Sequence, residues 1–162
     1  MNDHPTIPEP INIAVRALLQ SPLHWTMSHN TMLLAITGRR TGTAYRVPVS
    51  YSRDDNDLVC FTDSPWWINL RGGAAVAATI RGRWRNGTAQ VTYGPAITEH
   101  LTRHIKLVPR DAKYHSVQLD PKRQPNAADI ARAAEVTAMI RVQSDEPRQP
   151  RPTHINPTRR LT

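Results

Sequence analysis

The sequence predicts a mainly β protein with a few short helices, of the α+β class, arranged as a small β-barrel decorated by helices. Five or six short apolar segments, separated by turn residues, predict the strands of the barrel. A few segments with helical spacing or helix-start residues predict the helices. The chain has 162 residues, of which 39% are hydrophobic, so it is long enough to bury a core as a single domain.

The first half of the chain predicts one helix followed by three strands. Residues 1–9 are polar and proline-rich and are expected to be flexible. Pro10 suits the first turn of a helix, which then places apolar residues on one face and ends at Ser21-Pro22. That face is expected to pack on the core, with a weak contact to a membrane surface as the alternative. A hairpin turn at residues 54–57 joins the last two of the strands predicted at Met32–Thr37, Tyr45–Ser52 and Leu58–Thr62.

The second half predicts a mixture of short helices and further strands. Pro65 opens a short helix that the glycine pair after Arg71 ends. Gly82 and the Asn86-Gly87 pair mark turns or bulges. Asn126 is placed to cap the last helix. The remaining elements are strands at Ala75–Ile80, Arg83–Thr92 and Glu135–Val142, helices at Glu99–Leu107 and Ala127–Ala134, and a connection at residues 108–125.

The domain is expected to span residues 10–143. Residues 144–162 contain many prolines and few apolar residues and are expected to form a disordered tail. The N-terminus lacks the pattern of a secretory signal, and a lone cysteine, Cys60, cannot form an internal disulfide. Cys60 sits in an apolar run and is expected to be buried. A cytoplasmic location follows as the expectation.

The net charge of +8 makes acidic partners plausible, among them phosphates, nucleic acid and anionic membranes. Arginine carries most of this charge, and two arginines lie in the turn Gly38-Arg39-Arg40-Thr41-Gly42 between predicted strands. Guanidinium groups and turn N–H groups together suit a phosphate, because the planar fork donates two parallel hydrogen bonds. The alternative is a solvated hairpin turn. The flat rings of Trp66 and Trp67 further on are of a kind that covers a flat cofactor.

No metal site is predicted. The acidic turn at residues 54–57 is too short for a calcium loop and lacks its closing glutamate. His100 and His104 have the spacing of metal ligands on a helix, but no third ligand is evident, so exposed helix histidines are expected. Serine and cysteine hydrolase patterns are also missing, so no catalytic residue is assigned. An enzyme that takes its chemistry from a bound cofactor fits this chain better.

Three motifs occur in order in the middle of the chain. The first is Thr-Gly-Arg-Arg-x-Gly at residues 37–42, followed by Arg46 and then Val-Pro-Val. The second is Trp-Trp-x-Asn-Leu at residues 66–70, and the third is a set of glycine-containing triplets between residues 71 and 89. The stretch from about Leu33 to Val91 resembles the deazaflavin-dependent nitroreductase and quinone reductase family, whose members are split β-barrel flavin- or deazaflavin-binding proteins.

The resemblance implies a cofactor site. In the family, the arginine-containing turn and the next strand bind the cofactor's phosphate and ring edge, and the strand end before the short helix borders the ring. Carried over to this sequence, the implied cofactor-binding residues are Arg39, Arg40, Thr41, Gly42, Arg46, Val47, Pro48, Val49, Thr62, Asp63, Ser64, Trp66, Trp67 and Asn69. Tyr114 is a candidate for the tyrosines that line the substrate pocket in some members.

The resulting hypothesis is a split-barrel oxidoreductase that uses the reduced deazaflavin coenzyme F-420 to transfer a hydride to a small acceptor such as a quinone or nitro compound. An FMN-binding protein of the same fold is one alternative. A basic nucleic-acid-binding barrel is another, although only 6% of the residues are aromatic, so no specific nucleic acid is expected. The family commonly pairs, and Arg83–Thr92 is expected to be an open sheet edge, so a homodimer is predicted.

Overall fold

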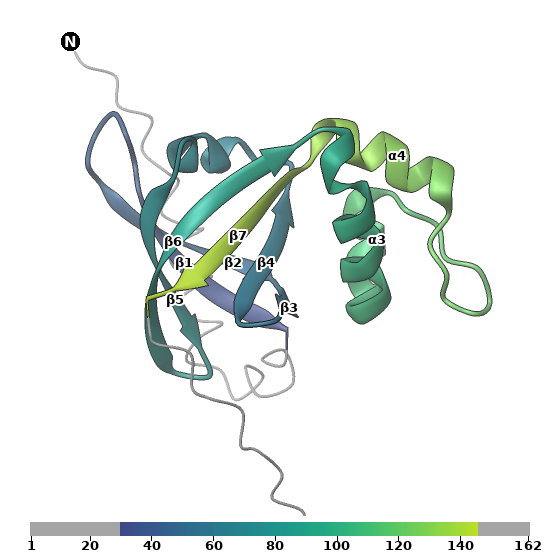
Figure 1. Cartoon of the computed structure of the whole chain (residues 1–162), viewed down its shortest axis with the longest axis horizontal. Coiled ribbons are helices and arrows are strands. Elements are labelled where there is room, and N and C mark those ends of the chain that lie inside the picture. Colours follow the sequence, from purple (N-terminus) through teal and green to yellow (C-terminus); the bar gives the residue numbers. More distant parts are fainter. Residues whose placement is uncertain (1–29, 146–162) are drawn as a thin grey trace, which may run out of the picture.

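The computed structural model describes residues 30–145, which form a single curled antiparallel sheet with helices packed on one side (Figure 1). The strand order in the sheet is β2-β1-β5-β6-β7-β4-β3. The strands are β1 (Thr31–Thr37), β2 (Ala44–Ser50), β3 (Ser52–Asp54), β4 (Asp57–Thr62), β5 (Ala74–Ile80), β6 (Arg83–Tyr93) and β7 (Ala138–Ser144). The predicted mainly β architecture with a few helices is therefore confirmed.

The sheet curls until its two edges meet. The edge strands β2 and β3 are consecutive in the sequence and are separated by Tyr51 alone, so the two ends of the strand order are joined at this residue. Tyr51 is buried, and its N–H donates to the carbonyl of Asn30 at 2.8 Å. This bend is why the strand expected at Tyr45–Ser52 ends at Ser50 and a separate strand starts at Ser52.

Two hydrophobic clusters divide the core. One fills the inside of the curled sheet, and the other lies between the sheet and the helices. Side chains alternate between the two faces of a strand, and in β4 Leu58 and Cys60 enter the first cluster while Val59 and Phe61 enter the second. This double burial explains the unbroken apolar run in β4. Cys60 is buried as expected, and burial raises the pKa of its thiol to about 12.

Helices α3 and α4 pack against the end of the sheet that carries β4 and β7 (Figure 1). Helix α3 (Thr98–Leu107) buries Leu101 and Ile105 in the second cluster. Helix α4 (Ala127–Val136) is capped as expected by Asn126, whose side chain accepts hydrogen bonds from the N–H groups of residues 128 and 129. Three 3-10 helices complete the described part: η1 (Pro65–Leu70), η2 (Pro95–Ile97) and η3 (Pro109–His115).

Several sequence predictions need correction. Helix α4 continues to Val136, so β7 starts at Ala138 rather than Glu135, and β7 runs to Ser144, the first residue of the expected tail. The expected open edge at Arg83–Thr92 is wrong, because β6 pairs with β5 on one side and β7 on the other. The edges are β2 and β3 instead.

Glycine at position 87 is explained by close strand approach rather than by the predicted turn or bulge. Asn86 and Gly87 lie inside the continuous strand β6. A Cβ atom at position 87 would collide with the backbone carbonyl of Gln143 in β7. Gly82, by contrast, lies in the β5–β6 turn with φ +76°, as the turn prediction requires.

The remaining N-terminal and C-terminal predictions, the helix starting at Pro10 and most of the tail at residues 144–162, lie outside the described residues. No helix within residues 30–145 is long and apolar enough to cross a lipid bilayer.

Replacing Gly87 with alanine should destabilise the sheet, because the new methyl group collides with backbone atoms that cannot rotate away. The expected loss of unfolding free energy is about 1–3 kcal/mol. Urea denaturation followed by circular dichroism measures it. Gly82→Ala is the control for backbone conformation, since open space surrounds position 82 and only its positive φ is unfavourable. A smaller loss for Gly87→Ala than for Gly82→Ala would contradict this account.

Candidate functional site

A pocket of about 450 Å³ opens between strand β2, the end of β4, and the 3-10 helices η1 and η3. We call it the β2–η3 pocket. This volume is within the range of small-molecule and cofactor sites. Its lining residues are Thr31, Val47, Pro48, Val49, Ser50, Phe61, Thr62, Asp63, Ser64, Trp66, Arg110, Asp111, Tyr114 and His115.

The walls of the β2–η3 pocket are mainly apolar, with polar groups at the edges. Val47 and Val49, two residues apart on the edge strand β2, contribute one wall, and Trp66 in the first turn of η1 contributes another. The loop after β4 adds small polar groups, where the N–H of Ser64 donates to the hydroxyl of Thr62 at 3.1 Å. Apolar walls with a few polar edge groups suit a flat ring system that carries hydrogen-bonding atoms on its rim.

A buried polar network lies beside the pocket. His104 Nε2 is 2.8 Å from Asp111 Oδ2, and His104 Nδ1 is 2.9 Å from the hydroxyl of Ser52. These bonds join α3, η3 and β3. The His104 ring also packs on Phe61, with 4.9 Å between ring centroids. The prediction that His104 is an exposed helix histidine is therefore wrong, because the residue is only 1% exposed. The polar groups that its ring bonds to lie on other elements, and helix periodicity does not reveal them.

The environment shifts the pKa of two groups that line the pocket. Burial alone would raise the pKa of Asp111, but the hydrogen bond and charge of His104, with help from Ser50 and Arg110, lower it. Asp111 is therefore ionised at neutral pH, and since a carboxylate only accepts hydrogen bonds, His104 Nε2 carries a proton. Burial, reinforced by the charge of His104, lowers the pKa of His115 against the opposing effect of nearby carboxylates.

Asn69 ties the arginine-containing turn to η1. Its Oδ1 accepts from the N–H of Arg39 at 3.0 Å, and its Nδ2 donates to the hydroxyl of Tyr45 at 2.5 Å and to the carbonyl of Trp66 at 3.0 Å. The guanidinium of Arg39 donates to the carbonyl of Arg71. Both side chains thus fix the position of the turn relative to η1.

The other residues of the first motif lie on the surface. Arg40 and Thr41 are exposed, and Gly42 has φ +68°, which closes the turn. The Arg46 guanidinium lies 5.0 Å from the ring centre of Trp84, a cation–π contact on the outside of the sheet. Thr41 also accepts from the N–H of Thr43 at 3.3 Å.

The two tryptophans of the second motif separate. Trp66 lines the β2–η3 pocket, whereas Trp67 does not. Trp67 packs partly against the first core cluster, with its ring 5.7 Å from that of Tyr93 and 4.8 Å from the guanidinium of Arg71.

The implied cofactor residues thus fall into two groups. One group lines the β2–η3 pocket: Val47, Pro48, Val49, Thr62, Asp63, Ser64 and Trp66. The other group does not line it: Arg39, Arg40, Thr41, Gly42, Arg46, Trp67 and Asn69. The assignment of both groups to cofactor binding remains a prediction.

The 3-10 helix η3 contributes pocket residues that the sequence pattern does not predict. Residues 108–125 were expected to be connection, yet η3 supplies Arg110, Asp111, Tyr114 and His115 to the pocket. Of these, only Tyr114 was a candidate beforehand. The available signal was a proline followed by closely spaced charged and aromatic residues, which is also typical of an ordinary surface loop.

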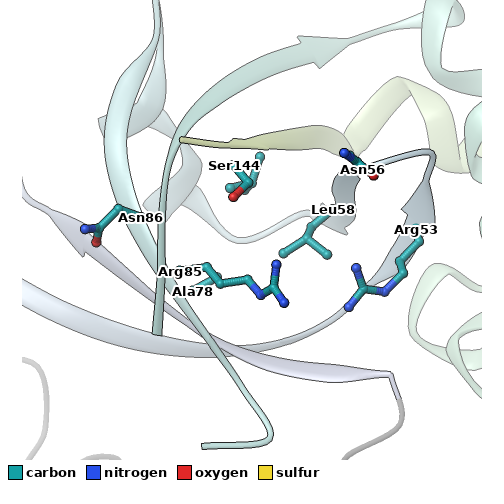
Figure 2. Close-up of a pocket in the computed structure, with 8 residues that line it drawn as sticks. Arg53, Asn56, Leu58, Ala78, Arg85, Asn86 and Ser144 are labelled. Carbon is teal, nitrogen blue, oxygen red and sulfur yellow. The ribbon is translucent and has the colours of Figure 1, made fainter. Parts of the chain in front are cut away.

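A second hollow lies among the opposite ends of the strands (Figure 2). Figure 2 shows the guanidinium groups of Arg53 and Arg85 directed into the same space, with Leu58 beside them. Its cavity volume is about 10 Å³, which holds about one water molecule. It is therefore too small for a ring-shaped ligand. Within residues 30–145, no group of three or more metal-ligating side chains is present.

Comparison with known proteins identifies the family. The family model described as F420H(2)-dependent quinone reductase matches residues 19–126. The chain belongs to this family. It is accordingly an oxidoreductase that depends on the deazaflavin coenzyme F-420, as the resemblance implied. None of the curated proteins matches the sequence.

Solved structures share the fold at low sequence identity. An F420-H2 dependent reductase is 15% identical, with a TM-score of 0.50 over 71% of this chain and 95% of that one. A structure described as a domain-swapped dimer is 13% identical, with a TM-score of 0.50 over 83% and 98%. A protein of unknown function from Agrobacterium tumefaciens str. C58 is 16% identical, with a TM-score of 0.50 over 90% and 58%. The curled sheet is thus a split β-barrel, as predicted.

Replacing Asn69 with alanine should destabilise the fold by about 1–3 kcal/mol, because three hydrogen bonds between the turn, Tyr45 and η1 are lost. Thermal unfolding followed by circular dichroism measures the loss. Gln118→Ala is the matched control, since Gln118 is an exposed amide residue on the α3–α4 connection. Equal melting temperatures for the two variants would show that the Asn69 bonds contribute nothing.

The lowered pKa of Asp111 predicts a contribution to stability that depends on pH. Unfolding restores the ordinary value of 3.8, so this stabilisation is complete above that value and is lost as pH falls through the lower folded pKa. Asp111→Asn should be less stable at pH 7 by up to about 3 kcal/mol. It should also lose stability less steeply than wild type below about pH 4. Urea midpoints measured at several pH values give both slopes, and parallel slopes would refute the assignment.

Proposed function

We propose that this oxidoreductase binds the ring of reduced coenzyme F-420 in the β2–η3 pocket and reduces a quinone-type acceptor there. The observation that supports this most is the lining of the pocket, which combines Val47, Val49 and Trp66 with polar groups at the rim. The reduced deazaflavin supplies the hydride when it is bound. The residues of the chain bind and orient the ring and exclude water from it.

The surface next to the pocket supports a place for the cofactor's charged tail. Pro48 lines the pocket, and Arg46 lies two residues before it on the same exposed face of β2. Alternate residues on a strand are about 6.6 Å apart, so a tail that leaves the ring beside Pro48 passes Arg46. Arg40 lies further along, at the exposed turn. The Arg39 guanidinium is occupied by the carbonyl of Arg71, which leaves Arg40 and Arg46 as the proposed phosphate contacts.

The acceptor is proposed to enter on the η3 side. Tyr114 is 66% exposed, and with His115 and Asp63 it also lines a neighbouring hollow of about 290 Å³ that reaches α4. A quinone agrees with the description of the family, and a nitro compound is a second acceptor of similar size and flatness. FMN, which carries a similar ring, is the alternative cofactor for the same pocket.

We also propose that the protein forms a homodimer in the cytoplasm. One structure with the same fold is described as a domain-swapped dimer, and β2 and β3 are the edge strands of the sheet within residues 30–145. Light scattering at micromolar concentration should give about twice the chain mass of 18.3 kDa. A mass near that of one chain would contradict the dimer.

Fluorescence titration of the full-length protein tests the cofactor. Coenzyme F-420 should bind more tightly than FMN, and both cofactors are titrated under the same conditions. Tenfold tighter binding of FMN would overturn the cofactor preference. If the protein were instead a nucleic-acid-binding barrel, neither cofactor would change the fluorescence. We expect any binding of this protein to DNA to be nonspecific and to weaken steeply as the salt concentration rises.

Arg40→Ala and Arg46→Ala should each lower the affinity for coenzyme F-420 by roughly ten- to a hundredfold, because each removes a charge-assisted hydrogen bond to phosphate. Their melting temperatures should change little, since both side chains are exposed. Lys122→Ala is the matched control, because it removes one positive charge from an exposed loop away from the pocket. Affinities equal to that of the Lys122 variant would mean that these arginines do not contact the tail.

A further inference from the structure

One buried oxygen atom at the β2–η3 pocket has no hydrogen-bond partner. Asp111 lines the pocket and is 4% exposed. Its Oδ2 bonds to His104, but its Oδ1 is buried without a hydrogen bond. The side chain of Ser50 also hydrogen-bonds the Asp111 carboxyl and lowers its pKa, yet Oδ1 itself has no hydrogen bond. Nε of Arg110 lies 3.9 Å from Oδ1, close enough for an ion pair but beyond hydrogen-bond distance. A buried ionised oxygen without a donor is costly, so its presence at a pocket calls for a ligand.

The side chain of Asp111 is held in a fixed orientation. His104, 1% exposed, binds Oδ2, and Ser52 binds the other ring nitrogen of His104 at 2.9 Å. Phe61 packs on the same ring. The guanidinium of Arg110, the preceding residue, bonds to the hydroxyl of Thr31 at 3.0 Å. With Oδ2 and its surroundings fixed in this way, Oδ1 is the carboxylate atom left to accept a bond.

We propose that Oδ1 of Asp111 is a ligand-binding atom that accepts a hydrogen bond from a ring N–H or O–H of the molecule in the β2–η3 pocket. This inference rests on the proposed function of that pocket. Two molecules of the reaction carry such a donor: the cofactor, through the imide N–H of its deazaflavin ring, and the acceptor, through the O–H that a quinone gains when it is reduced to a hydroquinone. Asp111 thereby selects ligands that present a donor at this point of the rim.

The first test uses Asp111→Asn. An asparagine that keeps its oxygen toward His104 turns its NH₂ group toward the ligand, so an acceptor is replaced by a donor of the same shape. Affinity for oxidised coenzyme F-420, measured by fluorescence titration, should fall about ten- to a hundredfold. Asp55→Asn is the matched control, since it makes the same exchange at an exposed turn residue that does not line the pocket. It should leave the affinity unchanged.

The second test changes the ligand as well as the protein. A deazaflavin with its imide nitrogen methylated lacks the N–H donor, and wild type should bind it about ten- to a hundredfold more weakly than the unmethylated ring. Asp111→Asn should not distinguish the two rings, which completes a double-mutant cycle. In the acceptor arm, 1,4-naphthohydroquinone and 1,4-naphthoquinone are titrated without oxygen. If the donor belongs to the acceptor, wild type prefers the hydroquinone and the asparagine variant does not.

The outcomes separate the inference from the proposed function. Coupling in the deazaflavin arm assigns Oδ1 to the cofactor, and coupling in the naphthoquinone arm assigns it to the acceptor. A third outcome is that wild type binds coenzyme F-420, but its affinity ratio for the two deazaflavins and for the two naphthoquinone forms equals that of Asp111→Asn. The proposed function then stands, and Asp111 serves only to join α3 to η3. If wild type binds neither the deazaflavins nor the naphthoquinone pair, both proposals are overturned.

Discussion

The burial of β4 and β7 on both faces is the constraint on which the rest of the structure depends. Because their side chains alternate between the barrel interior and the helical side, these two strands belong to both hydrophobic clusters. The inner cluster requires the sheet to curl until β2 and β3 meet at Tyr51, and the outer cluster holds α3 and α4 against the barrel. Two cores therefore share one pair of neighbouring strands.

The β2–η3 pocket is a consequence of this arrangement. The curl brings β2 next to the end of β4, and the helices packed outside place η3 across the gap between them. The buried His104–Asp111 bond then fixes η3 to α3. A buried hydrogen bond to a carboxylate is weak evidence for stability, because desolvation of the carboxylate offsets much of the attraction. Its location at a pocket is better explained by positioning, since it leaves the other carboxylate oxygen without a hydrogen-bond partner.

The arginines that carry most of the net charge of +8 make different kinds of contact. Arg141 bonds to Asp54 and Asp57 at 2.7 and 3.1 Å, where it fixes the β3–β4 hairpin to β7. Arg39 supports the turn through the carbonyl of Arg71, and Arg46 lies over the ring of Trp84. Arginines that look alike in the sequence therefore differ in whether their guanidinium groups remain available for a phosphate. That difference arises from neighbours that are distant in the chain.

The sequence by itself determined the local elements and the family motifs. The apolar run of β4, the proline that opens η1, and the cap at Asn126 depend on interactions within a few residues, and these elements begin within one residue of the predicted starts. The tertiary structure alone decided that His104 is buried against Asp111, that β6 is an interior strand, and that η3 lines the pocket. Each of these features depends on strand order and helix packing, which join segments far apart in the chain, and periodicity within one segment carries no information about its distant partner.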